Sequence, residues 1–229
     1  MARTGGQALV EALKINGVSH AFCVPGESYL AVLDALYDAR DEIKLVTCRQ
    51  EGGAANMAEA FGKLTGKPGI CFVTRGPGAT NASIGVHTAF QDSTPMILFV
   101  GQADQSMLDR EAFQEVDFRA MFAPLAKWSA EIRDPSRIPE YVARAFHVAM
   151  SGRPGPVVLS LPEDVLSGAC ESGDAAPTQK TEPVASREQV KRLHTMLMGA
   201  ERPFLVLGGP GWTADAITDM RNFAEKFDL

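Results

Sequence analysis

Short apolar segments alternate with helix-like segments along most of this chain, and this alternation restricts the fold more than any other feature of the sequence. Two of the apolar segments, residues 69–74 and 96–100, are nearly continuous runs of large apolar side chains. Such runs are typical of strands that are buried on both faces of a parallel sheet, with helices on either side. The sequence therefore predicts an α/β fold: a three-layer, doubly wound parallel sheet with helices on both faces.

The individual elements follow from the spacing of apolar residues and from residues that begin or end helices. Thr4 is a suitable N-cap for the first helix, which Gly17 ends. Residues 102–127 are more polar and predict a loop with a short helix. The predicted strands are residues 18–24, 43–48, 69–74, 96–100 and 157–161, and the predicted helices are residues 4–16, 29–37, 51–64, 79–90 and 136–150.

The composition changes after residue 166, and this change divides the chain into three parts. Residues 1–166 form the first domain, and residues 167–186, which have hardly any large apolar side chain, form a linker. Residues 187–229 predict a helix, a strand at 204–207 and a second helix, the start of a second α/β domain. Because so short a unit cannot bury its own core, we expect this chain to be part of a longer protein.

Charge and composition exclude several classes of protein. The 229 residues carry a formal net charge of −6, which argues against nucleic acid as a partner. No apolar run approaches the roughly 20 residues of a membrane helix, and the N-terminus lacks an apolar signal core. We therefore expect a cytoplasmic protein without membrane contacts. The four cysteines and four histidines show no metal-ligand spacing, so we assign no metal ligand to this chain.

Glu51 lies between a predicted strand and a helix whose first residues carry almost no side chains: Gly52, Gly53, Ala54 and Ala55. An acid in the first turn of a helix complements the helix dipole, and this common role would explain Glu51 alone. It does not explain the glycines, each of which weakens a helix by about 0.5–1 kcal/mol relative to alanine. A bulky planar ligand lying against this bare surface, with Glu51 facing it, accounts for both features.

A second motif follows the next predicted strand. It reads Thr74-Arg75-Gly76-Pro77-Gly78-Ala79-Thr80-Asn81. A strand-to-helix turn that needs glycine would explain this loop without any ligand. The spacing matches neither a Rossmann nor a Walker fingerprint, and Pro77 removes an N–H group that a phosphate cradle would use. Ligands of open α/β sheets bind at the carboxyl ends of strands, where Glu51, this motif and residues 25–26 all lie, so a wall for a flat ring is the better interpretation.

Several short motifs occur in an order that resembles one known family. They are Pro25-Gly26, Glu51 with residues 58–62, residues 74–81, residues 89–92 with Pro95, Gly101-Gln102, residues 112–115 and residues 151–157. Together they closely resemble the pyrimidine-binding domain of the thiamine diphosphate enzymes of the acetolactate synthase, pyruvate oxidase and benzoylformate decarboxylase group. The resemblance covers the chain to about residue 165 and implies the thiamine diphosphate-binding fold. It makes residues 187–229 the beginning of the central, Rossmann-like domain.

The resemblance implies roles for individual residues. The glutamate that matches Glu51 hydrogen-bonds N1′ of the aminopyrimidine ring and activates the cofactor for attack on a 2-oxo acid. Phe113 and Gln114 match the pair that faces the substrate. The residues that match the cofactor-binding positions are Pro25, Gly26, Glu51, Thr74, Gly76, Pro77 and Asn81.

The resemblance also implies thiamine diphosphate and Mg²⁺ as cofactors, and a homodimer or homotetramer with its active site at the subunit interface. In the family, the diphosphate and Mg²⁺ are bound by another domain that contains Gly-Asp-Gly, a sequence that does not occur in this chain. We therefore expect this chain alone to be catalytically inactive. The complete protein is expected to act on a small 2-oxo acid as a carboligase or decarboxylase.

The chain departs from the acetolactate synthase pattern at several positions. Gln50 replaces a histidine, residues 103–106 lack the usual proline and arginine, and Glu163 replaces a lysine. These departures count against acetolactate synthase activity proper and against FAD binding. The presence of Glu51 argues against the glyoxylate carboligase branch, which lacks that acid.

Two other functions are compatible with parts of the sequence. A non-catalytic dimerisation or interaction module could retain the fold, because the small residues that follow Glu51 also allow close helix packing. A nicotinamide-dependent dehydrogenase would use residues 208–211, but neither the dinucleotide fingerprint nor its downstream acid is in place. The sequence does not distinguish carboligase, decarboxylase and oxidase, and it does not name the donor or acceptor.

Overall fold

A computed structural model describes residues 3–209 and 211–229 of the chain. The chain divides into two compact units, Met1–Lys180 and Thr181–Leu229. The boundary lies inside the predicted linker, and Pro210 of the glycine-rich segment 208–211 lies outside the described residues.

A six-stranded sheet forms the centre of the first unit. Its strands, in spatial order, are β3 (Lys44–Thr47), β2 (His20–Cys23), β4 (Gly69–Val73), β5 (Met96–Gln102), β7 (Pro156–Pro162) and β6 (Trp128–Glu131). All neighbouring strands are parallel, which confirms the predicted parallel sheet. The prediction missed β6, because this edge strand is only half-buried and therefore lacks a continuous apolar run.

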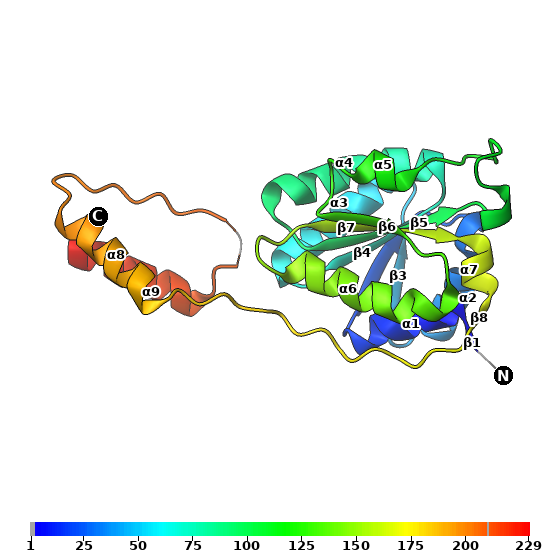
Figure 1. The fold of residues 1–229 in the computed structure, drawn as a ribbon, viewed down its shortest axis with the longest axis horizontal. Helices are drawn as coiled ribbons and strands as arrows, with labels where there is room; N and C mark the ends of the chain where they lie inside the picture. Colours follow the sequence, from blue (N-terminus) through cyan, green and yellow to red (C-terminus); the bar gives the residue numbers. More distant parts are fainter. Residues whose placement is uncertain (1–2, 210) are drawn as a thin grey trace. The chain divides into compact units, whose positions relative to one another are not determined.

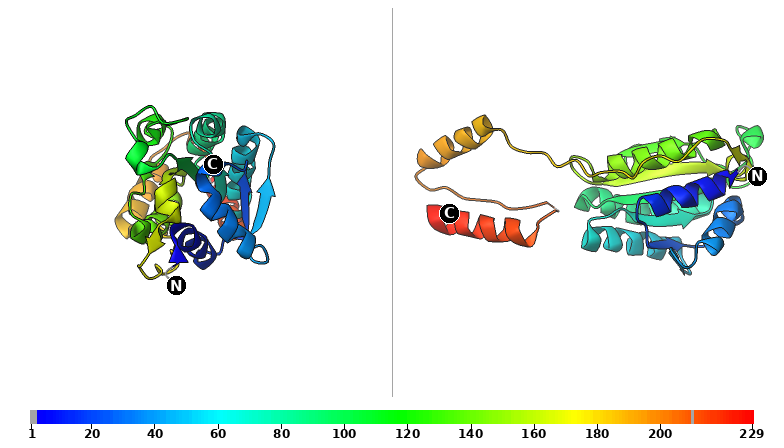
Figure 2. Two further views of the ribbon diagram at one scale, coloured as in Figure 1. Left: turned by 90° about the vertical axis from the view of Figure 1, so that its right-hand side faces the viewer. Right: turned by 90° about the horizontal axis from the view of Figure 1, so that it is seen from below.

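Helices cover both faces of the sheet, as predicted (Figure 1). One face packs against α1 (Gly5–Ile15), α2 (Leu30–Asp38) and α6 (Ile138–Met150). The other face packs against α3 (Glu51–Thr65), α4 (Gly76–Asp92) and the short α5 (Phe118–Phe122). Figure 2 shows the same layers from two further directions.

The alternating direction of strand side chains explains why both faces are apolar. In β4, Ile70 and Phe72 point into the core beneath α1 and α2, whereas Cys71 and Val73 point into the core beneath α3 and α4. All four side chains are fully buried. A strand covered on both faces therefore reads as one apolar run.

The ends of the first unit are joined by a small second sheet. β1 (Arg3–Thr4) pairs antiparallel with β8 (Ala169–Cys170), which follows α7 (Glu163–Ser167). Thr4 caps α1 in a capping box with Gln7, as its position predicts. The described residues of this unit also form three short 3₁₀ helices: η1 (Glu27–Tyr29), η2 (Gln105–Met107) and η3 (Pro135–Arg137).

The second unit contains α8 (Arg187–Met198) and α9 (Ala214–Phe227). The predicted strand at 204–207 is wrong, because these residues form no regular element. Phe204 and Val206 are 89% and 81% exposed. A strand needs a neighbouring strand for its hydrogen bonds, and none pairs with these residues in the described part of this unit.

Among the described residues, no helix combines the length and apolarity that crossing a membrane requires.

Candidate functional site

The carboxyl ends of β2, β3 and β4 bring the predicted site residues to one edge of the sheet. The chain runs from β2 outward to β3 and returns to β4 on the other side of β2, so the strand order reverses there. Ligands of doubly wound sheets bind at such a switch point. Pro25 and Gly26 follow β2, Glu51 follows β3, and Thr74 follows β4.

Glu51 is the first residue of α3 and is partly exposed. The preceding residue, Gln50, caps the helix by accepting a hydrogen bond from the N–H of Gly53 at 2.9 Å. The Glu51 Oε2 atom accepts a hydrogen bond from the Asn81 side-chain amide at 2.9 Å. Its Oε1 atom accepts no hydrogen bond from the described residues. The predicted residues Glu51 and Asn81 are therefore in direct contact, and one carboxylate oxygen is left for another donor.

Most small residues of α3 are explained by its packing against α4. A Cβ atom on Gly85 would lie 2.5 Å from the Ala55 Cβ, and one on Gly52 would lie 3.2 Å from the Asn81 carbonyl oxygen. Gly53 differs from these residues, because a Cβ atom there would meet nothing within 4 Å. Helix packing thus accounts for part of the bare surface but not for Gly53, which is exposed.

The second motif is mostly helix rather than loop, which corrects the prediction. α4 begins at Gly76 instead of residue 79, so only Thr74 and Arg75 link it to β4. Pro77 therefore occupies the first turn of a helix, where its missing N–H is not needed. The backbone at Gly26 approaches Thr74 so closely that a Cβ atom would lie 2.5 Å from the Thr74 Cβ. The Thr74 hydroxyl also shares a 2.9 Å hydrogen bond with Ser28.

Phe113 and Gln114 also lie at this edge, next to the start of α4. The Gly76 N–H donates to the Gln114 carbonyl at 2.9 Å, and Gln114 has a positive φ of 62°. The Glu115 carboxylate accepts hydrogen bonds from the N–H groups of Asp109 and Ala112 and so stabilises the turn. The Phe113 ring is 69% exposed. The substrate-facing pair of the resemblance is thus held through its backbone, with the Phe113 ring free on the surface.

One family accounts for this arrangement. The family model described as "Thiamine pyrophosphate enzyme, N-terminal TPP binding domain" matches residues 3–121, which contain every predicted site residue. The chain belongs to the thiamine pyrophosphate (thiamine diphosphate) enzyme family.

The curated relatives of this TPP-binding chain agree with the match. It is 37% identical over 238 residues to the acetolactate synthase of Arthrospira platensis. That alignment covers 99% of this chain and 40% of the relative. It is 38% identical to the large subunit of acetolactate synthase isozyme 2 of Escherichia coli K12, with coverage of 96% and 40%. A probable acetolactate synthase large subunit of Methanocaldococcus jannaschii is 36% identical, with coverage of 96% and 38%. The chain thus spans about two fifths of the length of these relatives.

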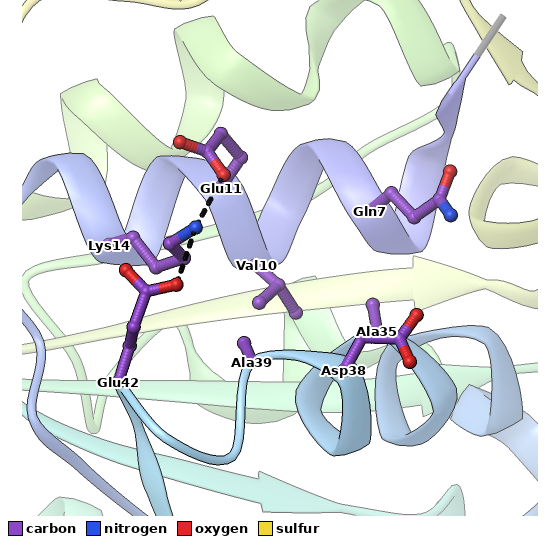
Figure 3. Close-up of a pocket in the computed structure, with 8 residues that line it drawn as sticks. All are labelled: Gln7, Val10, Glu11, Lys14, Ala35, Asp38, Ala39 and Glu42. Atoms are coloured by element: carbon purple, nitrogen blue, oxygen red, sulfur yellow. Dashed lines mark hydrogen bonds and ion pairs between the residues drawn. The ribbon is translucent and has the colours of Figure 1, made fainter.

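The TPP-binding domain has a surface pocket of about 210 Å³ between α1 and α2, away from the predicted site (Figure 3). Lys14 bridges Glu11 and Glu42 there at 3.0 Å and 2.9 Å. The pocket contains none of the predicted site residues, and we assign it no function. In the described part of the chain, no three His, Cys, Asp or Glu side chains are arranged to hold a metal ion.

Tyr29 fixes the segment that carries Pro25 and Gly26, and the sequence did not single it out. Its ring packs against Phe72 with 6.0 Å between centroids, and its hydroxyl donates to the Val24 carbonyl at 2.5 Å. Burial raises the pKa of the Tyr29 phenol above its ordinary value, so the hydroxyl keeps its proton and remains a donor.

Tyr29→Phe is expected to lower the free energy of unfolding by about 1–3 kcal/mol, because the Val24 carbonyl loses its donor. Urea titration followed by circular dichroism measures this change. Tyr37→Phe is the matched control, since Tyr37 is 67% exposed and should lose nothing measurable. Equal stability of the two variants would show that this hydrogen bond does not hold the segment.

Proposed function

We propose that this chain is the N-terminal part of a thiamine diphosphate- and Mg²⁺-dependent enzyme that acts on a 2-oxo acid as a carboligase or decarboxylase. The observation that carries the proposal is Glu51: α3 presents its carboxylate at the ligand edge of a TPP-binding domain, and Asn81 holds only one of its oxygens. The acetolactate synthase relatives support a 2-oxo acid as the substrate class.

Thiamine diphosphate, when bound, supplies an electron sink for breaking the bond between a carbonyl carbon and its carboxylate. The residues present fit its aminopyrimidine ring, because the Glu51 carboxylate lies at the ligand edge and one of its oxygens accepts no hydrogen bond from the described residues. In the proposal Glu51 holds or releases a proton at the ring nitrogen it faces, which is general acid–base work. Asn81 orients the Glu51 carboxylate for that task.

The remaining predicted residues take supporting roles in the proposal. Phe113 and Gln114 lie toward the substrate, and the Phe113 ring is available because it is largely exposed. We place the Mg²⁺ and diphosphate ligands outside this chain. The other residues of the cofactor wall are Pro25, Gly26, Thr74, Gly76 and Pro77.

The active form in the proposal is a homodimer or homotetramer with the site at the subunit interface. Exposed apolar side chains on α3 and α4 support an interface on this face: Met57, Leu64 and Ile84.

The test uses the complete protein with thiamine diphosphate, Mg²⁺ and a panel of 2-oxo acids that includes pyruvate. We expect cofactor-dependent consumption of at least one 2-oxo acid with release of CO₂, and we expect no flavin absorbance in the purified protein. A complete protein that self-associates but neither binds the cofactor nor consumes a 2-oxo acid would instead support the interaction-module alternative.

A further inference from the structure

Arg75 is a buried cation placed between two carboxylates at the ligand edge. The residue is 8% exposed. Its Nη2 atom forms an ion pair with Glu163, at the start of α7, and its Nη1 atom lies 3.4 Å from the Glu27 carboxylate. The Nε atom is buried without a partner among the described residues. A buried charge is tolerated when it is paired, so Glu27 and Glu163 explain why Arg75 can lie here.

Arg75 and its neighbour hold two successive carbonyl groups of one segment. The Arg75 Nη1 atom donates to the Phe113 carbonyl at 3.5 Å, and the Gly76 N–H donates to the Gln114 carbonyl at 2.9 Å. Gln114 has a positive φ of 62°, which is uncommon for a residue other than glycine. Because the Phe113 side chain is largely exposed, backbone contacts such as these, rather than burial of the ring, hold the segment.

The residue after Glu163 holds the other end of the same segment. The Asp164 carboxylate accepts hydrogen bonds from the Gln105 N–H at 3.1 Å and from the Gln105 side-chain amide at 2.8 Å. Two adjacent acids after β7 thus contact both ends of the segment 105–114. Asp164 binds Gln105 directly, and Glu163 pairs with Arg75, which in turn binds the Phe113 carbonyl. Glu163, which stands where the acetolactate synthase pattern has a lysine, is the residue that pairs with Arg75.

We propose that Arg75 is a positioning residue that, together with Glu163, fixes the segment 105–114 so that Phe113 and Gln114 face the 2-oxo acid. Arg75 then acts mainly on the affinity for the substrate, because its side-chain partners in the described residues are Glu27, Phe113 and Glu163. The contact between Asn81 and Glu51 is separate from these. This inference rests on the proposed function for its substrate class, but the fixing of the segment can be measured without turnover.

The first experiment measures hydrogen exchange in the complete protein for wild type, Arg75→Met and Arg153→Met. Arg153 is the matched control, because it holds the opposite end of α4 through the Ser93 hydroxyl and the Phe90 and Gln91 carbonyls. Arg75→Met should speed exchange at the Gly76 amide and in peptides of residues 105–117 by about tenfold or more. Arg153→Met should leave those peptides unchanged.

Equal exchange of residues 105–117 in the two arginine variants would overturn the proposal. If Arg75→Met does not fold, Arg75→Lys and Glu163→Gln provide the same test. Arg75→Lys keeps the charge but loses the planar fork that reaches Glu163 and Phe113 together. Each should loosen the segment by a smaller factor, and unchanged exchange in both variants would also overturn the proposal.

The second experiment measures steady-state kinetics and cofactor binding of the same variants. Arg75→Met should raise KM for the 2-oxo acid by about tenfold, whereas the dissociation constant for thiamine diphosphate should rise by a smaller factor. Unchanged KM in a variant with a loosened segment would overturn the role in substrate affinity. A wild-type protein that consumes no 2-oxo acid would overturn the proposed function and the substrate role with it, while the exchange result would still decide whether Arg75 fixes the segment.

Discussion

Glu51→Gln in the complete protein is expected to lower turnover of a 2-oxo acid by about 10²- to 10⁴-fold, the range by which a positioned acid or base contributes. Glutamine keeps the size of the side chain and can still contact Asn81, but it cannot exchange a proton with a ring nitrogen. The fold should be unaffected, because Glu51 is partly exposed and belongs to no ion pair in the described residues. Thiamine diphosphate-dependent consumption of the substrate, together with a thermal melt, measures both effects.

A matched control for this variant is Glu11→Gln. Glu11 lies in the pocket between α1 and α2 and pairs with Lys14 there, away from the predicted site residues. The Glu11→Gln variant loses the same charge. It should keep wild-type turnover, because Glu11 lies away from the predicted site and its exposed ion pair contributes little to stability. A Glu51→Gln enzyme with turnover near that of Glu11→Gln would refute the assigned role of Glu51.

Phe72→Ala is expected to lower the free energy of unfolding of the first unit by about 3–5 kcal/mol, the usual cost of removing a buried aromatic ring. Phe72 is fully buried in the centre of β4. Its ring stacks on Phe99 with 4.8 Å between centroids and on Tyr29 with 6.0 Å. The substitution leaves a cavity beside the Tyr29 and Phe99 rings, and a buried site that relaxes only partly loses contacts there.

Phe113→Ala provides the comparison for this stability change. It removes the same ring, but Phe113 is 69% exposed, so urea titration by circular dichroism should show almost no loss. In the proposed function, Phe113→Ala instead weakens binding of the 2-oxo acid. Equal destabilisation by the two substitutions would contradict the description of Phe113 as a residue held only through its backbone.

The fold class could be predicted because the packing of the sheet determines which residues must be apolar over short stretches of the sequence. A strand such as β4 is covered by helices on both faces, so Ile70, Cys71, Phe72 and Val73 must all be apolar. The capping residue Thr4 is equally local, because its side chain bonds to a backbone N–H three residues away. Patterns of this range can be read directly along the chain.

Two strand predictions failed because strand formation depends on a neighbour. Residues 128–131 are only half-buried and carry little apolar signal, yet they form β6 because β7 offers backbone partners. Residues 204–207 have the stronger apolar signal, but they find no partner strand in the described part of their unit and stay irregular. Apolar composition alone does not decide such cases.

The sequence by itself determined the parallel α/β sheet, the helix that begins at Glu51 and the family motifs. Each of these leaves a pattern among residues that are close together along the chain. Only the tertiary structure decided the contacts among these motifs: Asn81 with Glu51, and Arg75 with Glu163 and Phe113. Those partners come from segments that follow β3, β4, β5 and β7, whose carboxyl ends the parallel sheet brings to one edge. Hydrogen bonds and ion pairs depend on the distance between two groups in space, and the separation of the two residues along the chain does not predict that distance.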